Sequence, residues 1–157
     1  MKELVEKYGV IIVKSAGNNG PIYSSINNIP QKIHEIIFVI GSCDTSERVE
    51  TNLHKNIKNN LPSISLFSSQ GPLTTNGSTG VTFLAPGYGI IEKSKYFSDN
   101  NPAVYNATSM SAPNAAGAIA CLISGFKANN ILITPFKLKF LWLIRLFFYP
   151  KKIVAIH

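Results

Sequence analysis

Two uninterrupted apolar segments constrain the fold of this chain more than any other feature of its sequence. The first is VIIV at residues 10–13, and the second is IIFVIGS at residues 36–42. Both are rich in β-branched residues and lack the polar/apolar alternation that is typical of a half-exposed strand. A strand that is apolar on both faces has to be covered on both faces, as the strands of a parallel sheet are. The two segments therefore predict buried parallel strands.

Two further segments have the form of a strand followed by a turn. ISLFSSQGP at residues 64–72 and VTFLAPG at residues 81–87 each run from apolar residues into a Gly/Pro turn. The polar stretch at residues 45–62 predicts an exposed loop. A sheet of only about three or four strands is thin for a doubly wound fold, and buried strands need neighbours on both sides. We therefore expect the chain to be part of a larger unit.

Helix signals precede and follow these strands. MKELVEKYG at residues 1–9 has one apolar face and a glycine that can end the helix. A second helix is predicted over residues 109–126, where small residues allow close packing and no charge occurs before Lys127, so we expect this helix to be buried. Thr134 as N-cap and Pro135 at the first helical position predict a third helix. This order of strands and helices predicts an α/β fold with a parallel sheet flanked by helices.

The charge distribution argues against a nucleic-acid partner. The chain has 157 residues, 45% of them apolar, which suits one domain with its own core. Its formal net charge is +7, yet residues 1–126 contain nine Lys and Arg against eight Asp and Glu, and all six remaining positive charges lie in residues 127–152. A nucleic-acid-binding protein would carry basic residues across a face of its fold. We therefore expect no nucleic-acid partner.

The sequence indicates neither a cofactor nor a metal. Cys43 and Cys121 are far apart and belong to no CxxC or CxxH pattern, so we interpret both as buried free thiols. The N-terminal segment is charged and amphipathic, unlike a signal peptide. We interpret the sequons at Asn76 and Asn106 as chance matches. These features predict a cytoplasmic protein.

Ser109 stands at the start of the predicted helix, within NATSMSAPNAAG at residues 106–117. The first amides of a helix lack intrahelical acceptors, so the Ser109 N–H and the helix dipole could stabilise negative charge on a carbonyl oxygen. The small residues behind Ser109 would seat the helix deeply and hold the hydroxyl still. Taken alone, however, the same serine could be an ordinary N-cap.

Four motifs follow one another along the chain: SAGNNG, FSSQGP, LAPG and NATSMSAPNAAG. In this order they resemble the C-terminal part of the catalytic domain of subtilisin-like serine peptidases. The resemblance implies a three-layer α/β/α fold with Ser109 as the nucleophile. It also implies that Asn18 donates a side-chain hydrogen bond to the oxyanion and that Ala16 and Gly17 line the pocket for the residue before the scissile bond. Read without the resemblance, Asn18 could be a turn residue, and Ala16 and Gly17 could serve packing alone.

Pro113-Asn114 narrows the resemblance, because most subtilisin relatives have Pro-His at this place. MSAPNAAGAIACLISGFKANNI and SAGNNGP are similar to the tripeptidyl peptidase II subfamily. That similarity implies peptide substrates and the release of tripeptides from free N-termini through an acyl-enzyme. It also implies homo-oligomers, a property carried over from the family alone.

The sequence lacks the motifs that carry the histidine and the carboxylate of such a site. A serine hydroxyl is activated by a histidine that a carboxylate orients, and the family carries both upstream of the oxyanion asparagine, in Asp-Thr/Ser-Gly and His-Gly-Thr motifs. Neither motif occurs here, and His34, His54 and His157 lack that glycine-containing context, so we interpret them as loop or surface residues. We expect a fragment that is inactive alone. The alternatives are a non-catalytic interaction module and a fragment of a subtilisin-like endopeptidase.

Two more departures from the family concern Ala107 and the C-terminus. Ala107 stands where the family has glycine, so its β-carbon puts activity in doubt unless the φ angle of Ala107 is negative. The resemblance ends near residue 141, which predicts a catalytic-domain part at residues 1–141 and a divergent tail at residues 142–157. The apolar run Phe140–Tyr149 is too short to span a bilayer. It could be a core helix or strand, a membrane-surface helix or an aberrant C-terminus, and we expect no membrane association.

Overall fold

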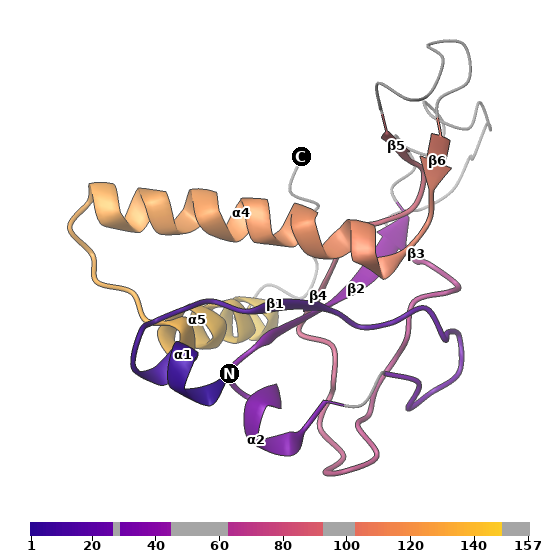
Figure 1. Cartoon of the computed structure of the whole chain (residues 1–157), viewed down its shortest axis with the longest axis horizontal. Coiled ribbons are helices and arrows are strands. Elements are labelled where there is room, and N and C mark those ends of the chain that lie inside the picture. The colour runs from indigo at the N-terminus through magenta and orange to yellow at the C-terminus, as the bar shows by residue number, and fades with distance from the viewer. Residues whose placement is uncertain (27–28, 45–62, 93–102, 149–157) are drawn as a thin grey trace.

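The computed structural model describes residues 1–26, 29–44, 63–92 and 103–148 (Figure 1). The first four elements alternate between helix and strand, and the two longest helices end the described chain. The helices are α1 (Lys2–Glu6), α2 (Gln31–His34), α4 (Thr108–Ala128) and α5 (Pro135–Phe148). The strands are β1 (Val13–Ser15), β2 (Phe38–Asp44), β3 (Ser63–Ile64), β4 (Phe83–Pro86), β5 (Ile90–Glu92) and β6 (Ala103–Tyr105).

β2 is the strand on which the main sheet is built. β1 and β4 both pair with it in parallel, with Ile40 of β2 opposite Ser15 of β1 and Phe83 of β4. β3 adds an antiparallel pairing at the end of β2, so the sheet is mixed. β5 and β6 form a separate antiparallel ribbon. The predicted architecture, parallel strands flanked by helices, is confirmed.

Strand boundaries differ from the sequence prediction. Pairing with β2 begins only at the Ile12 carbonyl, which accepts the Phe38 N–H at 2.9 Å, so β1 starts at the last residue of the apolar run 10–13. In the segment at residues 64–72, predicted as a strand followed by a turn, only Ile64 belongs to β3. The backbone turns earlier than predicted, since the Ser68 N–H donates to Ser65 O at 2.8 Å. The predicted loop at residues 45–62 lies outside the described residues.

Two apolar cores lie on opposite faces of β2, because successive side chains of a strand point to opposite sides. One core joins Phe38 and Ile40 to α4 and α5. The other joins Ile37 and Val39 to Ile33 of α2 and to the neighbouring loops. Figure 1 shows α4 along one side of the sheet and α2 on the other, which gives the three layers. β2 is buried in all but its last residue, as its sequence predicts.

The expectation that the helix at residues 109–126 is buried was wrong in part. Only one face of α4 is buried, formed by Thr108, Ser111, Ala115 and Ile119. Its opposite face is exposed and carries Cys121, which was expected to be a buried thiol, whereas Cys43 in β2 is buried. A helix of small, uncharged residues can lie against a sheet on one side without being enclosed, because its composition does not show how many neighbours it has.

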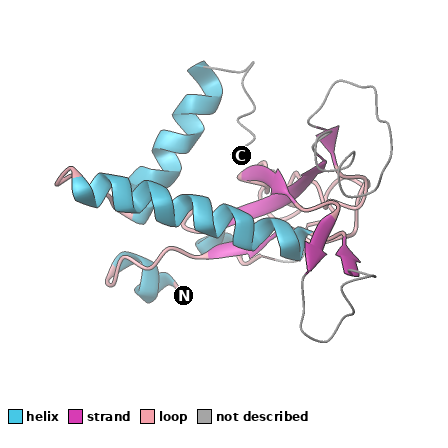
Figure 2. Ribbon diagram, turned by 90° about the horizontal axis from the view of Figure 1, so that it is seen from above, coloured by secondary structure: helices cyan, strands magenta, loops and turns pink. Residues whose placement is uncertain are grey.

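α5 begins as the sequence predicts. The Lys137 N–H donates to Thr134 Oγ1 at 3.2 Å, so Thr134 caps the helix and Pro135 is its first residue. Figure 2 shows the two long helices, α4 and α5, diverging from one another. α5 continues without a break through residue 142, where the divergent tail was predicted to start. No helix in the described segments is long and apolar enough to cross a membrane.

Because only one face of α4 is buried, two alanine substitutions in this helix should lower the free energy of unfolding by different amounts. Ile119→Ala should lower the free energy of unfolding by about 2–5 kcal/mol, because it opens a cavity in the core beneath α4. Leu122→Ala, on the exposed face, should lower it by about 1 kcal/mol or less. Urea unfolding followed by circular dichroism measures both values. Equal losses would contradict a helix packed on one face only.

Candidate active site

The candidate site lies where the parallel strands β1, β2 and β4 end. The segment from Ala16 to Asn18 follows β1 directly, and the turn at Gly87 follows β4. α4 begins at the same edge, since the Ala107 N–H donates to Gly87 O at 3.0 Å. Three segments distant in sequence therefore meet at one edge of the sheet, as the carboxyl ends of parallel strands do.

Thr108 connects the start of α4 to Asn18. Both the Thr108 N–H and the Thr108 hydroxyl donate to Asn18 Oδ1, each at 2.9 Å. A backbone N–H can only donate, so the oxygen of the Asn18 amide must face Thr108. The amide nitrogen is thereby turned away from Thr108, and its two hydrogens remain for other acceptors. The structure thus brings Asn18 beside the residue that precedes Ser109.

The backbone before Asn18 is held rigidly. Ala16 is fully buried, and its N–H donates to Ile40 O at 2.8 Å. The Gly17 N–H donates to Thr108 Oγ1 at 3.2 Å, while Gly17 O accepts the Ser69 N–H at 2.9 Å. The φ angle of Gly17 is +112°, a conformation that residues with a β-carbon rarely adopt. The backbone of residues 16–18 is therefore held in place beside the N-terminus of α4.

Ser109 is the second residue of α4 and is exposed to solvent. The amides of its neighbours on either side are occupied: the Thr108 N–H donates to Asn18 Oδ1, and the Met110 N–H donates to Ala107 O at 3.0 Å. In the described part of the chain the Ser109 N–H has no acceptor. The exposed hydroxyl of Ser109 therefore lies at the N-terminus of α4, one residue after Thr108, which binds Asn18.

The alanine that replaces the family's glycine causes no backbone strain. Ala107 has φ −163° and ψ 156°, which is extended backbone that any residue adopts. The φ angle of Ala107 is therefore negative, which is the condition that the sequence set for an alanine at this position.

The turn after β4 holds α4 in place through contacts that the sequence analysis missed. Asn114 Nδ2 donates to Pro86 O at 3.0 Å, which ties the first turns of α4 to the end of β4. A β-carbon on Gly87 would collide with Ser111 Oγ and would come within 2.7 Å of Ala107 O. Gly87 therefore permits the close approach of α4. The only sequence signal was the glycine itself at the end of the LAPG motif.

The acid and base expected of a serine peptidase are not among the described neighbours of Ser109. His34 was interpreted as a loop or surface residue, but it is buried, with Nε2 donating to Gly80 O at 2.9 Å. It precedes β2, so the seven residues of that strand, about 20 Å, separate it from the edge that carries Ser109. Asp44 contacts the Ser65 hydroxyl. His54 and His157 lie outside the described residues.

Comparison with known proteins identifies the family. The chain matches the profile of the Subtilase family (Peptidase_S8) over residues 2–143. The chain belongs to this family. The match begins at residue 2 and so covers almost the whole described chain, including the Asn18 segment and the start of α4.

The relatives of this subtilase include peptidases named Tripeptidyl-peptidase 2. Those of Drosophila melanogaster and Caenorhabditis elegans are each 36% identical to it over 140 residues, or 88% of this chain. The solved structure of Tripeptidyl Peptidase 2 (TPP II) superposes with a TM-score of 0.60 at 32% identity, again over 88% of this chain. The chain spans only about a tenth of these proteins: 9% of the fly protein, 10% of the nematode protein and 9% of the solved chain.

Thr108→Val tests the connection between α4 and the Asn18 segment. It removes the acceptor of the buried Gly17 N–H and one donor to Asn18, so the free energy of unfolding should fall by about 1–3 kcal/mol. Amide hydrogen exchange should accelerate at Gly17 by about tenfold or more relative to Ala16. Thr108→Ser keeps the hydroxyl and should keep the Gly17 amide protected. Loss of protection in both variants would contradict the assigned hydrogen bond.

Ser111 and Ser42 are both fully buried, but replacing each with alanine should change the free energy of unfolding in opposite directions. Ser111 Oγ has no partner among the described residues, whereas Ser42 Oγ lies 2.8 Å from Ser65 Oγ. Ser111→Ala should therefore raise the free energy of unfolding by about 1 kcal/mol, and Ser42→Ala should lower it by about the same amount. Urea denaturation measures both. A loss on Ser111→Ala would show that its hydroxyl is paired in solution.

Proposed function

We propose that this chain supplies the nucleophile and the oxyanion-binding groups of a subtilase peptidase site. The observation that carries the proposal is the pair of hydrogen bonds from Thr108 to Asn18 Oδ1. They bring a fixed amide donor to the helix terminus that carries an exposed serine hydroxyl. A nucleophile beside two unoccupied N–H donors is the arrangement that acyl transfer needs.

In the proposed reaction Ser109 Oγ attacks the carbonyl carbon of a peptide bond. Negative charge then develops on the carbonyl oxygen and is bound by the Ser109 N–H and by Asn18 Nδ2. Because Asn18 Oδ1 is held by Thr108, the Asn18 amide does not have to reorient as this charge appears. Preorganised donors of this kind stabilise the transition state more than the bound substrate.

Ala16 and Gly17 have a different proposed role. Their backbone lies directly before Asn18 and is held by hydrogen bonds from both sides. We assign them to the wall of the pocket for the substrate residue that precedes the scissile bond. Neither position carries a large side chain that would fill such a pocket.

The complete reaction needs an imidazole to take the Ser109 proton, and this sequence contains neither of the family's Asp and His motifs. We therefore propose that activity belongs to a larger catalytic unit and that the isolated chain does not hydrolyse peptides. By similarity to the proteins named Tripeptidyl-peptidase 2, the substrates would be peptides with free N-termini, cleaved to release tripeptides. A cytoplasmic location and homo-oligomers are proposed on the same similarity.

A fluorogenic amide of Ala-Ala-Phe tests the proposal. The purified chain should not cleave it, because a serine hydroxyl without a base is a weak nucleophile. The chain should cleave it when mixed with the part of the Drosophila melanogaster Tripeptidyl-peptidase 2 that precedes the matched segment. Ser109→Ala should abolish that cleavage. Asn18→Ala should lower kcat by about 10²–10³, a magnitude that comes from subtilisin itself and not from this geometry.

The controls distinguish the alternatives. Cleavage that survives Ser109→Ala would assign the nucleophile elsewhere and contradict the proposal. A fluorophosphonate probe should label Ser109 in the mixture and leave the Ser109→Ala variant unlabelled. A mixture that forms a stable complex but shows neither labelling nor cleavage would favour a non-catalytic interaction module.

A further inference from the structure

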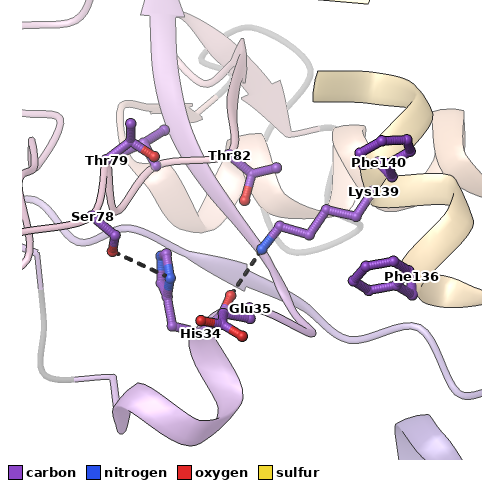
Figure 3. Close-up of a pocket in the computed structure, with 9 residues that line it drawn as sticks. His34, Glu35, Ser78, Thr79, Thr82, Phe136, Lys139 and Phe140 are labelled. Carbon is purple, nitrogen blue, oxygen red and sulfur yellow. Dashed lines mark hydrogen bonds between the residues drawn. The ribbon is translucent and has the colours of Figure 1, made fainter. Parts of the chain in front are cut away.

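A second site lies at the opposite edge of the sheet from Ser109. A cavity of about 290 Å³ is located where β2 and β4 begin, between α2, the segment before β4 and α5 (Figure 3). Its volume is near the lower end of the range of small-molecule sites. Its lining combines two phenyl rings with an amine, a carboxylate, an imidazole and hydroxyls: Phe136, Phe140, Lys139, Glu35, His34, Ser78, Thr79 and Thr82.

Lys139 supplies the partly buried amine of this cavity. Its ammonium group reaches from α5 to the last residue of α2 and the segment after it, and it donates to His34 O and to Ile37 O, each at 2.8 Å. Burial lowers the pKa of Lys139 from 10.5 to about 8, and the negative charge of Glu35 opposes this shift. Compared with an amine of pKa 10.5, the unprotonated fraction at pH 7 is larger by a factor on the order of a hundred.

The two carbonyls also direct the lone pair of Lys139. A neutral amine keeps two N–H groups, and both can remain on His34 O and Ile37 O. The lone pair then points away from these carbonyls, and Lys139 lines the cavity. The neutral form is therefore fully hydrogen-bonded and still nucleophilic.

The groups around Lys139 fit a flat carbonyl compound. The rings of Phe136 and Phe140 lie 6.4 Å apart at an interplanar angle of 6° and form an apolar wall beside Lys139. Thr82 Oγ1 accepts the Val39 N–H at 3.0 Å, which leaves its own hydrogen for a ligand oxygen. His34 does not compete as a nucleophile, because Nε2 binds Gly80 O and Nδ1 faces Ser78 Oγ at 3.5 Å.

We propose that Lys139 captures small aromatic aldehydes as an imine, a reaction separate from peptide hydrolysis at Ser109. The lone pair of Nζ attacks the aldehyde carbon, the electrons of the C=O bond move to oxygen, and a proton passes from nitrogen to that oxygen. The resulting carbinolamine loses its hydroxyl group together with the second nitrogen-bound proton as water. One amine and one aldehyde thus give one imine and one water, without an oxidant or reductant. The aryl group lies against Phe136 and Phe140.

Reductive trapping of the folded chain tests the proposal. The protein is incubated at pH 7 with benzaldehyde and cyanoborohydride, which reduces the imine to a stable secondary amine, and the labelled lysines are mapped by mass spectrometry. Lys139 should be labelled at least about tenfold faster than Lys137, an exposed lysine on the same helix. Labelling of Lys139 should level off above about pH 8. Equal rates for the two lysines would overturn the proposal.

Two variants and a measurement in urea test whether the labelling of Lys139 depends on the residues around it and on the folded state. Phe136→Ala removes part of the apolar wall at an exposed position and should slow the labelling of Lys139 several-fold, whereas Lys137→Arg should leave it unchanged. In concentrated urea the preference for Lys139 should disappear, because it depends on burial in the folded chain. This comparison needs no variant at Lys139, whose loss could unfold the protein. A preference that persists in urea would overturn the proposal.

Discussion

The hydrogen bonds between Thr108 and Asn18 are the contact on which the proposed chemistry depends. They join segments that are 90 residues apart and place the end of β1 against the start of α4. The Thr108 N–H can only donate, so its bond to Asn18 Oδ1 sets both the position of the Asn18 amide and which way it faces. The same threonine accepts the Gly17 N–H, so one side chain organises the proposed oxyanion donor and the proposed substrate wall.

The central strand β2 separates two chemically different edges of the sheet. At its carboxyl end the exposed hydroxyl of Ser109 lies at the N-terminus of α4, close in sequence to the Thr108 contact with Asn18. At its amino end Lys139 donates to two carbonyls and is partly buried, and this burial lowers the pKa of its amine to about 8. The full length of the buried strand β2 lies between the two sites.

Several features could be predicted from the sequence because they depend on local chemistry. The apolar run at residues 36–42 predicts a buried strand, and Thr134-Pro135 predicts the start of α5, since a β-branched segment and an N-cap act over a few residues. The one-sided burial of α4 and the burial of His34 could not be predicted. Burial depends on how many elements pack against a residue, and in this chain those elements are distant in sequence.

The sequence by itself determined that Ser109 lies in the first turn of a helix and that Asn18 lies in a Gly/Asn turn after a strand, because caps, turns and strand runs are set by neighbouring residues. Only the tertiary structure decided that the Asn18 amide nitrogen points away from Thr108, that Gly87 admits α4, and that Lys139 lies in a cavity. These facts result from contacts between residues tens of positions apart. No local propensity carries information about such contacts, since they exist only after the sheet has assembled.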